Sequence, residues 1–215
     1  MKNAYYQAKI PAFCRAHSSF VLGELTQAHG FVLEHLQRQA WIDQIALLQE
    51  ALARFSAGHI LFEFVIPRMG KRADVILCLP SAVVVIEFKV GAREFLRADI
   101  DQAHDYALDL KNFHKGSHDL PILPILCATA AERAGAIDIR WSADDVAQPV
   151  LIGVDALAET LALIADTQTN AAVDFEAWME AGYEPTPTIV EAVQALFQNH
   201  GVWNTSLAPM PALAI

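Results

Sequence analysis

An acid and a lysine stand two residues apart within a strongly apolar segment of this chain. Glu87 and Lys89 belong to the string VVVIEFKV, and two residues at this spacing on a β-strand project from the same face. Asp74 opens the preceding apolar segment, so a short turn between the two segments would bring its carboxylate towards that of Glu87. Two carboxylates in an apolar setting repel each other unless a divalent cation lies near them. The three side chains therefore predict a metal site.

The predicted ligands are oxygen atoms, which suit Mg²⁺ or Mn²⁺. Asp74 and Glu87 would bind the cation, and the backbone carbonyl of Phe88 could add a further ligand. A cation held there would bind a water molecule and stabilise the charge that grows on a phosphate group. Lys89 would orient that water or lower its pKa. The chemistry that these residue types favour is metal-assisted attack of water on a phosphate group.

The acid-x-Lys triplet is weak support by itself, because average charged-residue usage yields about one or two in a chain of this size. Asp109 and Lys111 form a second match, but they fall in a predicted helix, where residues two apart do not face each other. A plainer interpretation places Glu87 and Lys89 on the solvated face of an edge strand, with Asp74 at the end of a turn. The apolar run around Glu87 argues for an interior strand instead.

The elements that must position these residues follow one another as a helix, three strands, a helix and a strand. Apolar residues from Trp41 to Phe55 recur at helical spacing, and Pro80 and Ser81 leave a connection short enough for an antiparallel hairpin. The predicted helices cover residues 31–55, 99–113, 155–165 and 188–199, and the predicted strands cover residues 59–66, 73–79, 82–90, 122–128 and 150–154. We expect one domain over residues 1–170, followed by a connector, helix and tail over residues 171–215.

The composition is that of a chain with a substantial core. Hydrophobic residues make up 54% of the 215 residues, and the mean hydropathy is +0.28, which is enough to bury a large apolar interior. No apolar run approaches the roughly 20 residues of a membrane span, and the N-terminus lacks a signal-type apolar stretch. We therefore expect a cytoplasmic protein without a membrane partner. The three cysteines show neither zinc nor disulfide spacing, and Cys78 and Cys127 are expected to be buried thiols.

The net charge of -10 argues against a surface that binds nucleic acid over its whole extent. Residues 68–115 nevertheless hold eight of the fifteen basic residues against seven acids, so a polyanion would meet the least repulsion there. The candidate nucleic-acid contacts in this stretch are Arg68, Lys71, Arg72 and Arg93. A solvated face of mixed charge is an equally good interpretation of these residues.

The histidines show no zinc-ligand spacing. We expect His104, His114 and His118 at the surface, where His114 could line a phosphate path together with Lys111 and Lys115.

The placed residues resemble the PD-(D/E)XK nuclease superfamily, in its RecB-like branch. The resemblance rests on R-A-D-V-I-L around Asp74, on I-E-F-K around Glu87 and Lys89, and on Gln102 and Tyr106, whose spacing of four puts them on one helical face. It implies an α/β fold of the restriction-endonuclease-like type, with an αβββαβ core and a mixed central sheet flanked by helices. It also implies a nuclease that hydrolyses DNA with Mg²⁺ or Mn²⁺, in which these five side chains are catalytic.

A closer resemblance covers most of the chain. The strings FEFVIPRMGKRAD, DYALDLKNFH and YEPTPTIVEA are similar to the N-terminal region of bacterial Schlafen group 3-like DNA/RNA helicases, in which a nuclease-like domain precedes a P-loop ATPase. The sequence contains no G-x-x-x-x-G-K-[ST], so the ATPase part is not expected here. The resemblance implies a helicase or ATPase partner in cis or in trans, and DNA rather than RNA as the favoured nucleic acid.

Two questions stay open at this stage. The superfamily carries a further acid on its first helix, for which Glu34 and Asp43 are candidates that no motif decides, and Glu63 on the first predicted strand is another possible contributor. The second question is activity. The alternatives to a nuclease are a nuclease-fold module that binds nucleic acid or a partner for a motor, and a purely structural domain in which Glu87 and Lys89 pair with each other.

Overall fold

The computed structural model describes residues 3–30, 35–66, 70–132, 137–165 and 173–186. By its contacts the chain divides into one unit from Met1 to Glu184 and another from Pro185 to Ile215. The described helices and strands all belong to the first unit. The helix predicted over residues 188–199 lies outside the described residues, and the domain division expected at residue 170 stays a prediction.

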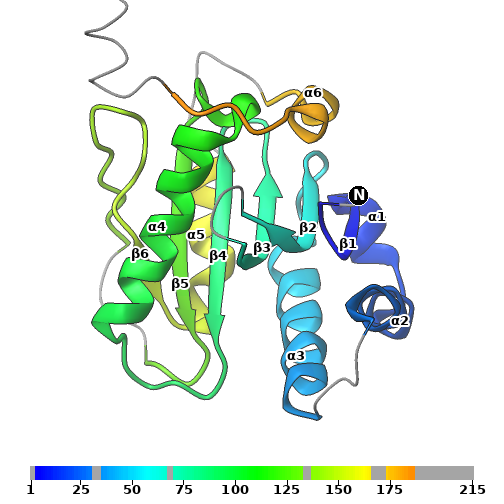
Figure 1. Cartoon of the computed structure of the whole chain (residues 1–215). Helices are drawn as coiled ribbons and strands as arrows, with labels where there is room; N and C mark the ends of the chain where they lie inside the picture. The colour runs from blue at the N-terminus through cyan, green and yellow to red at the C-terminus, as the bar shows by residue number, and fades with distance from the viewer. Residues whose placement is uncertain (1–2, 31–34, 67–69, 133–136, 166–172, 187–215) are drawn as a thin grey trace, which may run out of the picture. The chain divides into compact units, whose positions relative to one another are not determined.

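The first unit is built around one mixed sheet of six strands that lie side by side in chain order (Figure 1). Neighbouring strands run antiparallel from β1 to β4 and parallel from β4 to β6. The strands are β1 (Tyr6–Lys9), β2 (His59–Val65), β3 (Arg72–Cys78), β4 (Val83–Lys89), β5 (Ile122–Ala128) and β6 (Val150–Ile152). The protein is therefore a mixed α/β structure, as the sequence predicts.

Helices cover both faces of this sheet. They are α1 (Ile10–Arg15), α2 (Ser18–His29), α3 (His35–Ala51), α4 (Arg97–Phe113), α5 (Leu157–Ala165) and α6 (Phe175–Glu180), with short 3-10 turns η1 (Lys115–Ser117) and η2 (Val154–Ala156). Apolar residues of α1, α2, α3 and α5 share one core cluster with strand residues such as Val75 and Ile86. A second cluster joins α4 and α6 to residues of the opposite face, including Ile76 and Val85. Glu87 follows Val85 by two residues and so belongs to the α4 face.

The strand that carries Glu87 is an interior strand. β4 pairs with β3 on one side and with β5 on the other, and its residues from Val83 to Phe88 are all buried. A strand buried on both faces needs a nearly continuous apolar run, which explains the sequence of this segment. The predicted antiparallel hairpin between β3 and β4 is confirmed, and the edge-strand interpretation is wrong.

Several element boundaries differ from the predicted ones. The helix predicted to reach residue 55 ends at Ala51, and the strand predicted over residues 150–154 ends at Ile152. The sequence analysis did not predict β1, α1, α2 or α6. β1 has four residues, α1 and α6 have six each, and α2 contains Gly23, so periodicity is too short or too interrupted to indicate them.

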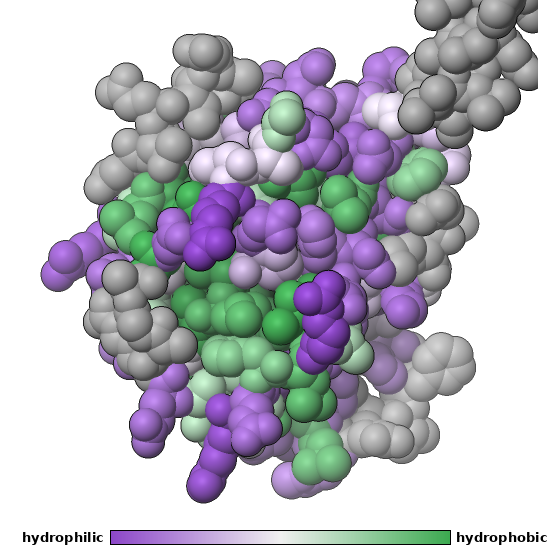
Figure 2. All heavy atoms as spheres, turned by 90° about the vertical axis from the view of Figure 1, so that its left-hand side faces the viewer, coloured by the Kyte–Doolittle hydropathy of each residue, from purple (hydrophilic) through white to green (hydrophobic). Residues whose placement is uncertain are grey.

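Two further expectations, on membrane-spanning helices and on the burial of the cysteines, can be compared with the described residues. Within them, no helix combines the length and the apolar character that crossing a membrane requires. Cys78 and Cys127 are buried free thiols, as expected, whereas Cys14 is half-buried. Figure 2 shows the face that carries β6 and α4, where polar side chains surround an area of apolar ones.

Candidate active site

Asp74 contacts the strand of Glu87 through its side chain. Main-chain pairing between β3 and β4 extends to Val75 and Ile86. At the next position the Asp74 carboxylate accepts a hydrogen bond from the backbone N–H of Phe88, with 2.8 Å between Oδ2 and N. The Asp74 carboxylate thus accepts a hydrogen bond just beyond the last main-chain pair of β3 and β4. This contact places Asp74 beside Glu87, as the sequence predicts.

Glu87 is 5% exposed, and its two oxygens have unequal surroundings. Oε1 accepts a hydrogen bond of 2.8 Å from Gln102 Nε2 and lies 3.4 Å from Lys89 Nζ. Oε2 is buried and has no hydrogen-bond partner. A buried carboxylate oxygen without a donor is unfavourable, and a cation is the ligand that would compensate it best.

Lys89 has three partners around its ammonium group. Nζ lies 3.1 Å from Gln102 Oε1, 3.1 Å from Asp99 Oδ1 and 3.4 Å from Glu87 Oε1. Partial burial lowers the pKa of Lys89, but the charges of Glu87 and Asp99 outweigh it and raise the pKa above its ordinary value. Lys89 is therefore a cation at neutral pH and can donate hydrogen bonds, but it cannot remove a proton from water.

The amide of Gln102 connects the acid, the lysine and a tyrosine. Nε2 donates to Glu87 and to the Tyr106 hydroxyl at 2.9 Å, while Oε1 accepts from Lys89. Both amide hydrogens and the amide oxygen are thus in use, which fixes the orientation of the side chain. The spacing of four between Gln102 and Tyr106 on α4 allows this contact. The structure therefore brings the predicted group of five side chains together.

Asp99 is a member of this group that the sequence analysis missed. The sequence places it only at the start of a predicted helix, whereas its carboxylate forms an ion pair with Lys89. Residues 99, 102 and 106 are spaced by three and four, so they share one face of α4. That spacing is the signal that could have identified Asp99.

The two strand carboxylates hold protons more tightly than isolated carboxyl groups do. Burial, reinforced by the charge of Glu87, raises the pKa of Asp74 well above its ordinary value. Burial also raises the pKa of Glu87 to about 7, although Lys89 opposes this change. A divalent cation would compete with these protons, so binding of a metal would release them.

The donor set fits a magnesium-type cation with water in its coordination sphere. Among the described residues, no group of three or more His, Cys, Asp or Glu side chains is arranged to hold a metal. Mg²⁺, however, binds proteins through one or two carboxylates and retains several waters. Asp74 and Glu87 supply two carboxylates. The carbonyl of Phe88 lies on the same side of β4 as its N–H, which faces Asp74, and so can add an oxygen.

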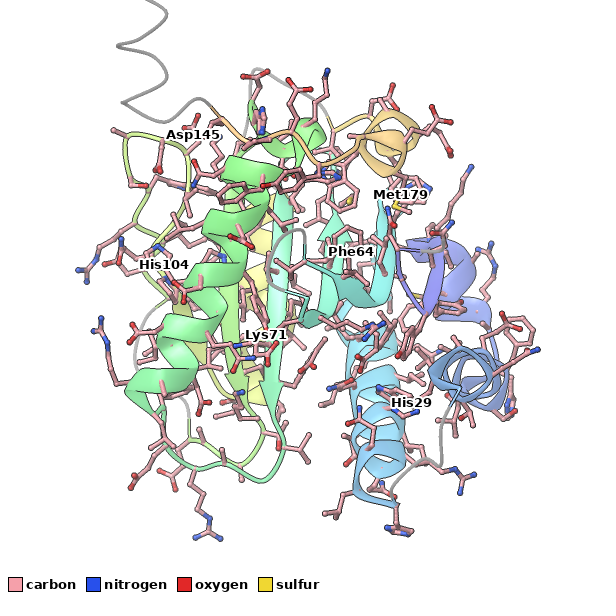
Figure 3. All side chains as sticks on the ribbon, viewed as in Figure 1. His29, Phe64, Lys71, His104, Asp145 and Met179 are labelled. Atoms are coloured by element: carbon pink, nitrogen blue, oxygen red, sulfur yellow. The ribbon has the colours of Figure 1, made fainter. Side chains whose placement is uncertain are left out.

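The three candidate nucleic-acid contacts among the described residues are exposed but not gathered in one place. Lys71 and Arg72 lie at the start of β3, two to three residues before Asp74, and Figure 3 shows Lys71 between α4 and α3. The Arg72 guanidinium stacks over the Tyr5 ring at 4.6 Å. Arg93 borders a surface hollow near residues 130–132. Arg68 lies outside the described residues.

The expected phosphate path beside His114 is wrong. His114 and Lys111 are buried, with the lysine donating a hydrogen bond to the backbone oxygen of Leu120 at 3.0 Å. His114 lies 2.9 Å from Ser117 Oγ through its Nδ1 atom. Lys115 is exposed and pairs with Glu184. His114 and Lys111 therefore belong to the interior, where the Trp178 ring of α6 packs on His114.

Asp43, the candidate for a helix acid that the structure describes, has its hydrogen-bond partner outside this group of side chains. Asp43 accepts a hydrogen bond from Gln39 on the exposed side of α3, and Glu34 lies outside the described residues. Figure 3 shows His104 on the outer side of α4.

Comparison of the chain with protein-family models, with curated proteins and with solved structures finds no match.

Proposed function

We propose that this chain is a metal-dependent nuclease domain of the PD-(D/E)XK type, which hydrolyses phosphodiester bonds of DNA with Mg²⁺ or Mn²⁺. The observation that carries the proposal is the buried Oε2 atom of Glu87, which has no hydrogen-bond partner. This atom belongs to a carboxylate next to Asp74 and Lys89. A purely structural ion pair would leave no reason for a carboxyl oxygen without a partner at this depth.

The order and direction of the central elements support a restriction-endonuclease-like fold. α3 is followed by the antiparallel strands β2, β3 and β4, then by α4 and by β5, which runs parallel to β4. This is the αβββαβ order that the resemblance implies. The two carboxylates and the lysine lie on the two central strands of this order, β3 and β4.

Each side chain has a distinct role in the proposed reaction. When bound, a divalent cation supplies a polarised water and stabilises the negative charge of the phosphorane-like transition state. Asp74 and Glu87 hold the cation. Lys89 orients the attacking water and stabilises its developing hydroxide character through its positive charge, because its three N–H donors already have partners. Gln102 orients Lys89 and Glu87 through its hydrogen bonds to both side chains, and the hydrogen bond to Tyr106 fixes the Gln102 amide.

The decisive experiment is cleavage of linear duplex and single-stranded DNA with Mg²⁺ or Mn²⁺. Lys89→Ala is expected to reduce the rate at least about 100-fold, because positioned proton-transfer and charge-stabilising groups contribute roughly 10²–10⁴. Arg97→Ala is the matched control. Arg97 is also a cationic side chain, but it pairs with Asp101 on the exposed surface of α4. Cleavage that survives Lys89→Ala would contradict the proposal.

A second function, binding without cleavage, is favoured by one observation. Lys89 is held by Asp99 at 3.1 Å, which reduces its ability to stabilise a hydroxide or a phosphate. On this alternative the domain docks DNA, or less favourably RNA, for a helicase or ATPase in cis or in trans. A manganese titration discriminates: loss of Mn²⁺ binding in Asp74→Asn supports the metal site, and absence of Mn²⁺ binding in the unmodified chain supports the binding module.

A further inference from the structure

A third carboxylate, that of Glu63, lies opposite Asp74 on the neighbouring strand. β2 and β3 pair Phe62 with Val75 and Phe64 with Ala73, which places Glu63 across from Asp74. The negative charge of Glu63 raises the pKa of Asp74 and also that of Glu87, after the larger effect of burial on each. Glu63 is therefore within electrostatic reach of both proposed metal ligands.

The backbone at Glu63 departs from strand geometry. Its φ of 54° is the left-handed conformation, which is unfavourable by roughly 1–2 kcal/mol for a residue with a Cβ. The side-chain alternation also changes here, because Phe64 and Ala73 join the core cluster under α4, while Phe62 and Val75 join the cluster under α3. Both strands change faces at the level of the two acids, Glu63 and Asp74.

Helix α3 holds the Glu63 carboxylate in place. Oε1 accepts a hydrogen bond from Trp41 Nε1 at 2.8 Å and another from Gln37 Nε2 at 3.4 Å. Trp41 and Gln37 are four residues apart and so share one helical face. Trp41 is fully buried, so its ring provides a rigid support. Two donors on one oxygen leave the carboxylate oriented by α3, at the strand position opposite Asp74.

We propose that Glu63 is a positioning carboxylate of the cation site, which accepts a hydrogen bond from a cation-bound water and is itself held by Trp41 and Gln37. The inference rests on the proposed metal-dependent function. Contact through water follows from two points. No three acids of the described part of the chain are arranged to hold a metal directly, and Mg²⁺ keeps several of its waters when bound to protein. The unpartnered Oε2 of Glu87 marks the same site independently.

The competing explanation is structural. Trp41 has a buried indole N–H that needs an acceptor, and Glu63 provides one. On that explanation the carboxylate contributes to folding alone, and its removal changes stability without changing the affinity for a cation. Metal affinity, measured on folded variants, is therefore the quantity that separates the two explanations.

The test is isothermal titration of the full chain with Mn²⁺. Glu63→Gln keeps the size of the side chain and an acceptor for Trp41 but removes the charge, and it is expected to weaken Mn²⁺ binding about tenfold, as removal of groups that support metal ligands does. Trp41→Phe keeps an aromatic ring but removes the donor, and a similar loss is expected. Asp43→Asn changes a half-buried acid on the same helix whose partner is Gln39. It should leave the affinity within about twofold, and circular dichroism verifies that each variant is folded.

The outcomes separate this inference from the proposed function. Binding by the unmodified chain that is lost in Asp74→Asn but unchanged in Glu63→Gln overturns the role of Glu63 and leaves the nuclease proposal standing. A loss in Glu63→Gln with no change in Trp41→Phe overturns the part of the inference that assigns positioning to α3. No Mn²⁺ binding by the unmodified chain overturns both the inference and the proposed metal site.

Discussion

At the scale of single residues, the candidate site is a connected set of hydrogen bonds with one gap. Gln102 links Glu87, Lys89 and Tyr106, and Asp99 holds Lys89 from the other side. The gap is Oε2 of Glu87. A divalent cation is the ligand that would compensate this buried oxygen best.

The left-handed backbone of Glu63 leads to a prediction about stability. Glu63→Gly and Glu63→Ala both remove the carboxylate, but only glycine adopts a positive φ without strain. Glu63→Gly is therefore expected to be more stable than Glu63→Ala by about 1 kcal/mol in urea unfolding. At Val65 on the same strand the order should reverse, since glycine weakens an extended position. The same order at both positions would show that the conformation at Glu63 carries no strain.

Buried His114 leads to a prediction about pH. Burial, with the nearby His118, lowers the pKa of His114 from its ordinary value of 6.5 to about 4. Between these values the unfolded chain binds a proton and the folded chain does not, so stability falls as the pH drops from 6.5 towards 4. The loss amounts to roughly 3 kcal/mol at most.

Denaturant unfolding at several pH values measures this effect. His114→Gln removes the titrating group, so the variant should lose less stability than the unmodified chain between pH 6.5 and 4. His104→Gln, on the outer side of α4, serves as the control and should keep the full pH dependence. Identical pH profiles for His114→Gln and the unmodified chain would refute the assignment.

At the scale of elements, α6 is part of the packed unit although its segment follows the predicted domain. Trp178 is 1% exposed, its ring lies 5.2 Å from that of Phe64, and its Nε1 donates to Ser117 Oγ at 2.9 Å. α6 thus joins β2 to the turn after α4. A helix of six residues is not stable alone, so its formation depends on this packing.

The packing of α6 can be tested with one substitution. Trp178→Ala is expected to lower the free energy of unfolding by about 3–5 kcal/mol, because it opens a large cavity against the α4 face of the sheet. Glu180→Ala on the exposed side of the same helix should change stability by less than about 0.5 kcal/mol. Equal, small effects of the two substitutions in urea unfolding would mean that α6 does not contribute to the core.

At the scale of the whole molecule, charge limits how the chain can approach a polyanion. The net charge is -10, and the candidate site holds the acids Asp74, Glu87 and Asp99 against one cationic side chain, that of Lys89. Binding of DNA should therefore be weak without a divalent cation and should fall steeply as salt rises. The basic residues nearest to Asp74 along the chain are Lys71 and Arg72, and both are exposed.

This expectation is testable with fluorescence anisotropy on a short labelled DNA. Ca²⁺, which seldom supports hydrolysis but can occupy oxygen sites, should strengthen binding, because it neutralises the acids that face the phosphates. Lys71→Ala should weaken binding and reduce the slope of log affinity against log salt by about 0.9. Arg140→Ala is the control, since Arg140 pairs with Asp138 on another exposed segment. Equal losses in both variants would exclude a specific role for Lys71.

Local sequence patterns were enough to predict the central elements and most of the site. Alternation along β4 put Glu87 and Lys89 on one face, the short turn indicated the hairpin with Asp74, and helical spacing joined Gln102 to Tyr106. Each of these relations depends on residues a few positions apart, or on two strands joined by a tight turn. For such relations the geometry of a strand or helix determines which side chains meet.

Other features depend on contacts between segments far apart in the chain, and tertiary structure alone decides them. Glu63 is held by a helix that ends eight residues before its strand begins, and its backbone conformation follows from strand packing rather than from its own preference. His114 and Lys111 look like surface residues in sequence, yet α6 and Leu120 bury them. Burial and long-range hydrogen bonds are properties of the folded chain. The sequence therefore determined the side chains of the candidate site, and the tertiary structure determined what supports them.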